Sequence, residues 1–299
     1  MPTSQIIEVA MGLIFIYYVL GSIVSFVTQM LLESAETRGA TLEEHLKQLA
    51  GDKSVDLTNL PQIKALRPIR YKNWTGVFGA KTEAKKVEKI PVNMLVDAFF
   101  DVTGLTGRED LDPANLTSAI GQLPESEGKQ ALLRWVNQGV TTINGLRDRS
   151  HDYFAGVLNQ AAATFKSHAR STVIIFSTIL VAALGTDSIQ IAKDLWANAE
   201  LRAVAAAQAS MVAQTDTTIG LDQLIQSLSE TTMRITWLQI MDTFPKDADA
   251  LGWIRFVVLK VIGLGISAWA VSQGSSFWYD FLKKLAGRGG SAPAEEGKG

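Results

Sequence analysis

The chain has 299 residues, of which 47% are hydrophobic and 19% are charged, and its formal net charge is −2. This near-neutral balance disfavours nucleic-acid binding, and the lack of cysteine excludes disulfides, thiolate metal sites and cysteine nucleophiles. The apolar residues gather in a few blocks instead of recurring at core-facing spacing, which is typical of membrane spans. We therefore predict an all-α integral membrane protein with three transmembrane helices and a mostly helical cytoplasmic domain.

Residues 1–33 form the first predicted transmembrane helix. No charged residue occurs between Val9 and Leu32. About 24 helical residues reach roughly 36 Å, which is enough to cross the hydrocarbon layer with some tilt. The apolar run is too long for a cleaved signal peptide, and the early charge is the acidic Glu8. We therefore expect this helix to be retained.

Residues 34–170 are polar with scattered apolar positions, and we predict that they form the cytoplasmic helical domain. Prolines and glycines divide its first half into short pieces. From Lys129 onward, apolar residues keep returning to one helical face: Leu132, Val136, Val140, Ile143 and Leu146. This pattern predicts an amphipathic helix that continues into the second transmembrane helix at 171–187.

Residues 188–252 are predicted to be an extracytoplasmic helical segment. Its first part is rich in alanine and carries the charged residues Lys193, Asp194, Glu200 and Arg202, so we expect a polar-faced helix that leaves the bilayer. A cysteine placed at Gln214 would then be labelled from outside.

The third predicted transmembrane helix covers residues 253–274. An interfacial amphipathic helix at 275–286 follows, and 287–299 are predicted to be a disordered tail. In the interfacial helix we expect Phe277, Trp278 and Phe281 to face lipid or the inner interface instead of a soluble core.

Basic residues indicate the orientation of the three helices. They are concentrated between the first two predicted spans and again after the third, whereas 188–252 carries more acids than bases. The positive-inside tendency therefore places the N-terminus and 188–252 outside, and the larger domain and the tail inside.

Three stretches resemble an uncharacterised family of bacterial three-span inner-membrane proteins. They read GLIFIYYVLGSIVSFVTQMLLESAETRGATLEEHLKQL, LGTDSIQIAKDLWANAELRAVAAAQA and ISAWAVSQGSSFWYDFLKKL, and together they cover about a third of the chain. The resemblance implies a multi-pass protein of the bacterial inner membrane, and it implies no catalytic residues.

No motif in the sequence predicts a catalytic, cofactor-binding or metal site. His45, His151 and His168 are far apart, and none has a metal-ligand spacing. The charged run from Arg147 to Asp152 is typical of a solvated helix face.

Two groups of residues are candidates for contacts with lipid or between helices. The basic residues beside the second and third spans are either topology anchors or contacts to anionic lipid headgroups. Small residues four positions apart allow close helix packing. The basic group is Lys166, His168, Arg170, Lys283 and Lys284, and the small pairs are Gly21 with Ser25 and Gly263 with Ser267.

Lys260 lies deep in the third predicted span, where an unpaired lysine costs on the order of 3 kcal/mol. It either extends outward to the membrane surface or finds an acid. Glu8 is the nearest candidate by depth, Asp187 is the alternative, and Arg255 is a second cation that could form such an interhelical pair.

The leading functional hypothesis is a non-enzymatic membrane anchor or scaffold whose cytoplasmic domain binds a protein partner. The expected partners are the lipid bilayer and a protein, or a second copy of the chain. The alternative is an oligomeric channel or transporter subunit lined by the hydroxyl and amide residues of the spans: Ser22, Ser25, Thr28, Gln29, Ser177 and Thr178. A surface-acting enzyme is a third hypothesis.

Overall fold

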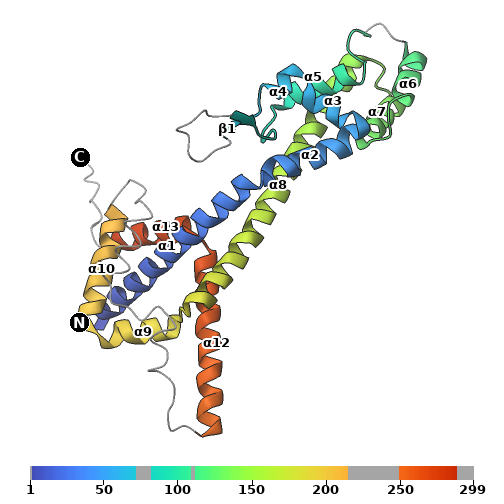
Figure 1. The fold of residues 1–299 in the computed structure, drawn as a ribbon. Helices are drawn as coiled ribbons and strands as arrows, with labels where there is room; N and C mark the ends of the chain where they lie inside the picture. Colours follow the sequence, from blue (N-terminus) through green and yellow to red (C-terminus); the bar gives the residue numbers. More distant parts are fainter. Residues whose placement is uncertain (1, 72–81, 109–111, 215–248, 288–299) are drawn as a thin grey trace, which may run out of the picture. The chain divides into compact units, whose positions relative to one another are not determined.

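The computed structural model describes residues 2–71, 82–108, 112–214 and 249–287 (Figure 1). The chain divides into two compact units. Unit 1 comprises Met1–Met30 with Arg170–Gly299, and unit 2 comprises Leu31–Ala169. The second range nearly coincides with residues 34–170, the predicted helical domain.

Apart from connecting turns and loops, the described residues form helices and one short two-stranded ribbon, in agreement with the all-α prediction. Strands β1 (Ile69–Tyr71) and β2 (Thr82–Ala84) pair antiparallel, with Arg70 opposite Glu83. Three helices are long and apolar enough to cross a membrane: Gln5–Ser34, Ile143–Leu184 and Ala250–Ser272. The predicted second span, 171–187, is the C-terminal part of a single helix of 42 residues followed by a turn.

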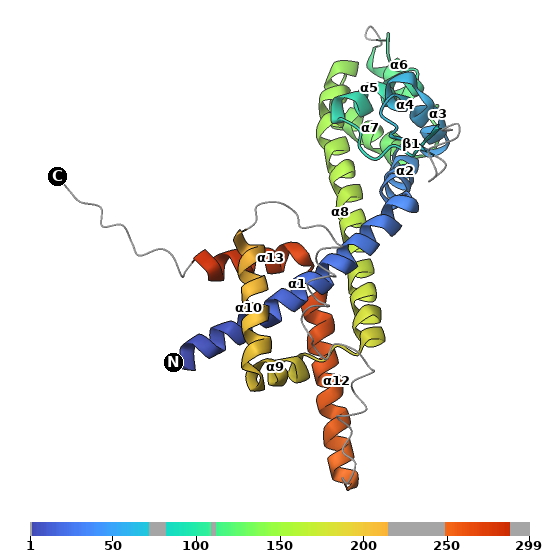
Figure 2. The same ribbon diagram turned by 60° about the vertical axis from the view of Figure 1, so that its left-hand side comes forward.

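The described residues of unit 1 form six helices or helix parts, drawn in Figures 1 and 2. In both views α9 lies crosswise to α10 and α12. The elements are α1 (Pro2–Ser34) up to Met30, the end of α8 (Ile143–Leu184), α9 (Ser188–Ala197), α10 (Ala199–Gln214), α12 (Ala250–Ser272) and α13 (Ser275–Gly287).

The middle of α1 forms the core of unit 1. Phe15, Ile16 and Val19 are fully buried, and they belong to one apolar cluster with Ala205 and Ala209 of α10. The alanines let α10 pack close to α1, because a Cβ added at Gly12 would lie 3.1 Å from the Cβ of Ala205. Burial of α1 by its neighbours therefore depends on small residues on both helices.

Unit 2 packs short helices on the first part of α8. Prolines begin two of them, since Pro61 and Pro113 occupy first-turn positions where no N–H is needed. Side-chain oxygens cap two N-termini: Asp112 caps α6, directly before Pro113, and Ser126 caps α7. The elements are α2 (Thr37–Ala50), the 3-10 turn η1 (Gly51–Lys53), α3 (Ser54–Asn59), α4 (Pro61–Lys64), α5 (Val92–Val102), α6 (Pro113–Gly121) and α7 (Glu127–Asn137).

Aromatic and aliphatic side chains fill the interior of unit 2. Phe99 of α5 packs edge-on against Phe154 of α8, with 5.1 Å between ring centroids. Leu46, Leu95 and Phe100 are fully buried in the same cluster. Unit 2 thus has a hydrophobic core of its own.

Candidate functional site

A buried ion pair joins α9 to the middle of α12. Lys260 Nζ lies 3.1 Å from Asp187 Oδ2, and the side chains are 13% and 9% exposed. Lys260 stands roughly 15 Å along α12 from its first residue. If α12 crosses a membrane, the pair therefore lies well inside the hydrocarbon layer.

Local structure positions the Asp187 carboxylate. Gly185, with a φ of 74°, follows the end of α8, and Asp187 then caps α9. Its Oδ1 accepts from the backbone N–H of Ile189 at 2.9 Å and of Gln190 at 3.3 Å. Gly263 leaves room for this group, because an added Cβ would overlap the Asp187 carboxylate.

A chain of hydroxyl groups runs beside the ion pair. Tyr17 donates to Ser188 Oγ at 2.6 Å, and Ser188 Oγ lies 2.7 Å from Ser267 Oγ. Ser267 donates in turn to the carbonyl oxygen of Gly263 at 3.0 Å. These bonds connect α1, α9 and α12 through buried polar atoms.

Lys260 pairs with Asp187, the alternative considered above, and not with Glu8. Glu8 Oε2 instead lies 3.1 Å from Arg202 Nε. Helix α10, which follows α9, packs beside the N-terminal part of α1 and so brings Arg202 to Glu8. The same guanidinium donates to the carbonyls of Leu195 and Trp196 and so satisfies the end of α9. Arg255 is exposed on α12.

Both predicted small-residue pairs lie at close contacts within unit 1. A Cβ added at Gly21 would lie 3.1 Å from the backbone of Gly274, in the turn between α12 and α13. Ser25 Oγ lies 3.8 Å from the Cβ position of Gly274. Gly263 and Ser267 face the start of α9, through the contacts described above.

The expectation that the C-terminal aromatics all face lipid or the inner interface is wrong for Trp278. This side chain is 8% exposed, its ring centroid lies 5.0 Å from that of Tyr17, and its Nε1 donates to Ala270 O at 2.7 Å. Gly274, with a φ of 82°, lets α13 turn back after α12. Phe277 and Phe281 are exposed, as expected.

The predicted basic contacts are exposed on two helices. Lys166, His168 and Arg170 lie on α8, and Lys283 and Lys284 lie on α13. Lys283 Nζ is 5.0 Å from the centroid of the Tyr279 ring. All five can reach solvent or headgroups.

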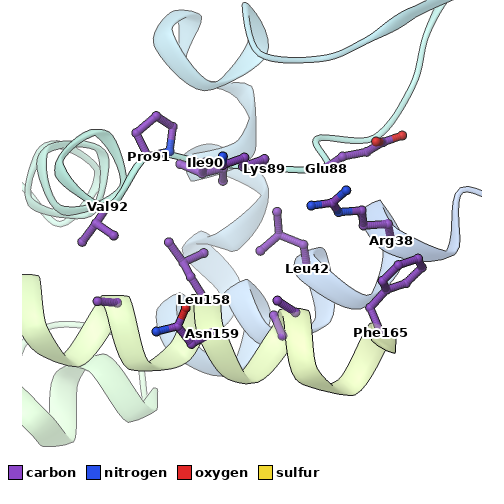
Figure 3. Close-up of a pocket in the computed structure, with 13 residues that line it drawn as sticks. Arg38, Leu42, Glu88, Lys89, Ile90, Pro91, Val92, Leu158, Asn159 and Phe165 are labelled. Carbon is purple, nitrogen blue, oxygen red and sulfur yellow. The ribbon is translucent and has the colours of Figure 1, made fainter. Parts of the chain in front are cut away.

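Unit 2 contains an apolar groove of about 400 Å³ between segment 88–92 and α8 (Figure 3). Leu42, Ile90 and Leu158 point into it, and the small Ala162 leaves space along α8. The full lining is Arg38, Leu42, Glu88, Lys89, Ile90, Pro91, Val92, Ala155, Leu158, Asn159, Ala161, Ala162 and Phe165. We call this the unit 2 groove.

Polar contacts hold the wall of the unit 2 groove in place. Lys86 donates its backbone N–H to Glu36 Oε2 at 3.0 Å, and its Nζ lies 2.6 Å from Glu43 Oε2. Gly39 allows this approach, because its Cβ position is 2.5 Å from Lys86 Cβ. The Arg38 guanidinium lies 5.9 Å from the centre of the Phe165 ring at the rim.

Sequence reasoning missed the unit 2 groove and the roles of Tyr17 and Ser188. Each arises from segments far apart in the chain, so no local spacing indicates it. A weak signal for the groove is the run of small residues on α8 at Ala155, Ala161 and Ala162. Within the described ranges, no three His, Asp or Glu side chains are grouped to hold a metal ion.

Comparison with known proteins adds no relative. No family model, curated protein or solved structure matches the chain. What the chain does is therefore inferred from the geometry of its own residues.

Proposed function

We propose that the protein is a non-enzymatic membrane anchor of the bacterial inner membrane. Its three long helices span the bilayer, and unit 2 lies on the cytoplasmic side and binds a protein partner. The observation that carries this proposal is the unit 2 groove, an apolar hollow with charged residues at its rim. Concave apolar sites with a few polar groups are the usual form of binding sites.

The rim of the groove favours an acidic partner segment. Arg38 and Lys89 are exposed beside the hollow, against a single half-buried acid, Glu88. A segment that places one large apolar side chain over Leu158 and a carboxylate beside Arg38 fits both the shape and the charge. Such charge complementarity sets the orientation and the rate of association more than the affinity.

Unit 1 has the features of an anchor rather than of a pathway. The charges of Lys260 and Asp187 neutralise each other, and Tyr17, Ser188 and Ser267 bond to one another. Polar groups satisfied in this way fix the packing of helices in lipid. Two residues that could line a channel are also bonded locally, since Ser22 donates to Tyr18 O and Thr178 to Ile174 O.

Photo-crosslinking in cells tests the binding site. A photoreactive amino acid replaces Asn159, which is exposed at the groove, and the adduct is identified by mass spectrometry. Ala162→Trp fills the hollow and is expected to lower the yield of that adduct about tenfold, a loss near 1.4 kcal/mol. The matched control is Ala163→Trp, because Ala163 is exposed next in sequence and does not line the groove.

Equal adduct yields with Ala162→Trp and Ala163→Trp would refute a partner in the groove. Ion flux through purified protein in liposomes would instead favour the alternative, an oligomeric channel or transporter subunit. A lipid or detergent adduct at position 159 would replace the protein partner with a small amphiphile.

A further inference from the structure

Helix α10 follows α1 from the N-terminal part of that helix toward α13. Arg202 pairs with Glu8, and one turn later Ala205 meets Gly12, so the two helices run in the same direction. Near its other end, Val212 and Ala213 are buried, and α10 packs on α13. Figures 1 and 2 show this course beside α1.

The outward face of α10 is apolar. Its exposed positions between Arg202 and Gln214 are Ala203, Val204, Ala207 and Met211, the last with 63% exposure. No charged residue occurs in that stretch. A helix that faces water normally carries polar or charged residues on its outer face.

The exposed residues of α7 in unit 2 offer a comparison with those of α10. Its exposed positions are Glu127, Gln130, Arg134 and Asn137, all of them polar. In α10 the charges are confined to the first turn, at Glu200 and Arg202. Exposed alanines also occur in unit 2, at Ala162 and Ala163 of α8. The contrast with α7 therefore rests on the exposed Val204 and Met211 and on the lack of charge after Arg202.

We propose that α10 lies in the hydrocarbon layer beside α1, with Val204, Ala207 and Met211 in contact with lipid acyl chains. Helix α9 lies crosswise to α10, and after Asn198 the chain enters the hydrocarbon layer as α10. Helix α10 packs on α1, which is long and apolar enough to cross a membrane, and its exposed Val204 and Met211 are apolar. This adjacency points to lipid as the occupant. This proposal rests on the proposed membrane insertion, and it replaces the expectation that all of 188–252 lies outside.

Site-directed fluorescence tests the proposal cleanly, because the sequence contains no cysteine. Single cysteines at Met211, Val261 of α12 and Gln130 of α7 are labelled with an environment-sensitive dye in the full-length protein, reconstituted in liposomes. Each position is exposed on its helix, so the label does not disturb a core. Quenching is measured with nitroxide-labelled phospholipids and separately with iodide.

We expect the label at Met211 to behave like that at Val261, with strong quenching by lipid nitroxides and several-fold weaker quenching by iodide than at Gln130. Iodide quenching at Met211 equal to that at Gln130, with Val261 still shielded, would overturn the α10 proposal alone. Iodide access at both Met211 and Val261 would overturn membrane insertion itself. Energy transfer between labels at Met211 on two copies, without lipid quenching, would show that a second copy covers the face.

Discussion

The two units of the chain arrange polarity in opposite ways. In unit 2 the interior is aromatic and aliphatic around Phe99, and the outward face of α7 is polar. In unit 1 large apolar side chains such as Val261 point outward, whereas the ion pair of Asp187 and Lys260 is buried. This difference is what two units in different solvents would show. In the proposed membrane arrangement, the buried polar groups would give unit 1 specific contacts that apolar packing alone does not supply in lipid.

Breaking the buried ion pair gives the largest expected effect. Lys260→Met leaves the Asp187 carboxylate buried without its cation, which costs about 3–5 kcal/mol. Adding Asp187→Asn removes the charge and keeps an oxygen to cap α9, so most of the stability returns. Thermal unfolding of the purified protein, followed by size-exclusion chromatography, measures both variants.

Arg255→Met is the matched control for the ion pair, because Arg255 is an exposed cation on the same helix. Its unfolding temperature should stay close to that of the unmodified protein. If Lys260→Met melts no earlier than Arg255→Met, the ion pair does not stabilise unit 1.

Adding a lysine at an exposed position of each unit tests whether the two units face different solvents. Val261→Lys puts a lysine on the apolar face of α12 near its middle, and it should disfavour membrane insertion by about 2.5–3.5 kcal/mol. Gln130→Lys on α7 should change stability by less than about 0.5 kcal/mol. An insertion reporter measures the change in insertion free energy of α12, and thermal unfolding measures the change in stability of unit 2. Equally small effects of the two substitutions would contradict the idea that the two units face different solvents.

Overpacking tests whether the core of unit 2 is tight. A Cβ added at Gly128 would lie 2.5 Å from the carbonyl oxygen of Leu49 and 2.8 Å from the Phe99 ring. Gly128→Ala should therefore destabilise unit 2 by about 1–3 kcal/mol. Hydrogen exchange of full-length protein should show faster exchange in α2 and α5, and unchanged exchange there would mean that the core relaxes around the methyl group.

The smallest effect is a gain in stability. Gly156 lies inside α8 within unit 2, and a Cβ there would meet nothing within 4 Å. Gly156→Ala should stabilise the helix by about 1 kcal/mol, because alanine loses less backbone entropy than glycine. Slower hydrogen exchange around residue 156 would show it, and a loss of stability would mean that this face of α8 is occupied in the membrane-bound protein.

Hydropathy and periodicity located the helices well, because they depend on residues close in sequence. The charge-free run from Val9 to Leu32 lies in α1, and the apolar periodicity that begins near Leu132 continues into α8 from Ile143. Caps such as Asp112 before Pro113 are equally local. The single helix predicted from Lys129 onward is wrong, because α7 ends at Asn137 and α8 begins at Ile143, with Gly139 at a φ of 94° between them.

The contacts between helices were less accessible, because they depend on where the chain reverses. Estimated depth in the membrane favours Glu8 as the partner of Lys260. In the structure, α10 instead brings Arg202 beside Glu8. Trp278 was placed with its neighbours on a lipid-facing surface, but the turn at Gly274 buries its ring against Tyr17. In each case one reversal of the backbone decided the partner.

The ion pair between α9 and α12 also bears on the order of synthesis. Asp187 is made about seventy residues before Lys260, and at roughly 5–20 residues per second the ribosome needs about 4–15 s to cover that distance. In the proposed membrane arrangement, the Asp187 carboxylate lacks Lys260 as a partner throughout this interval, because Lys260 has not yet been synthesised. We therefore expect the second and third proposed spans to settle in lipid as a pair. Nascent chains that end before Lys260 should then still hold Asp187 at the membrane surface.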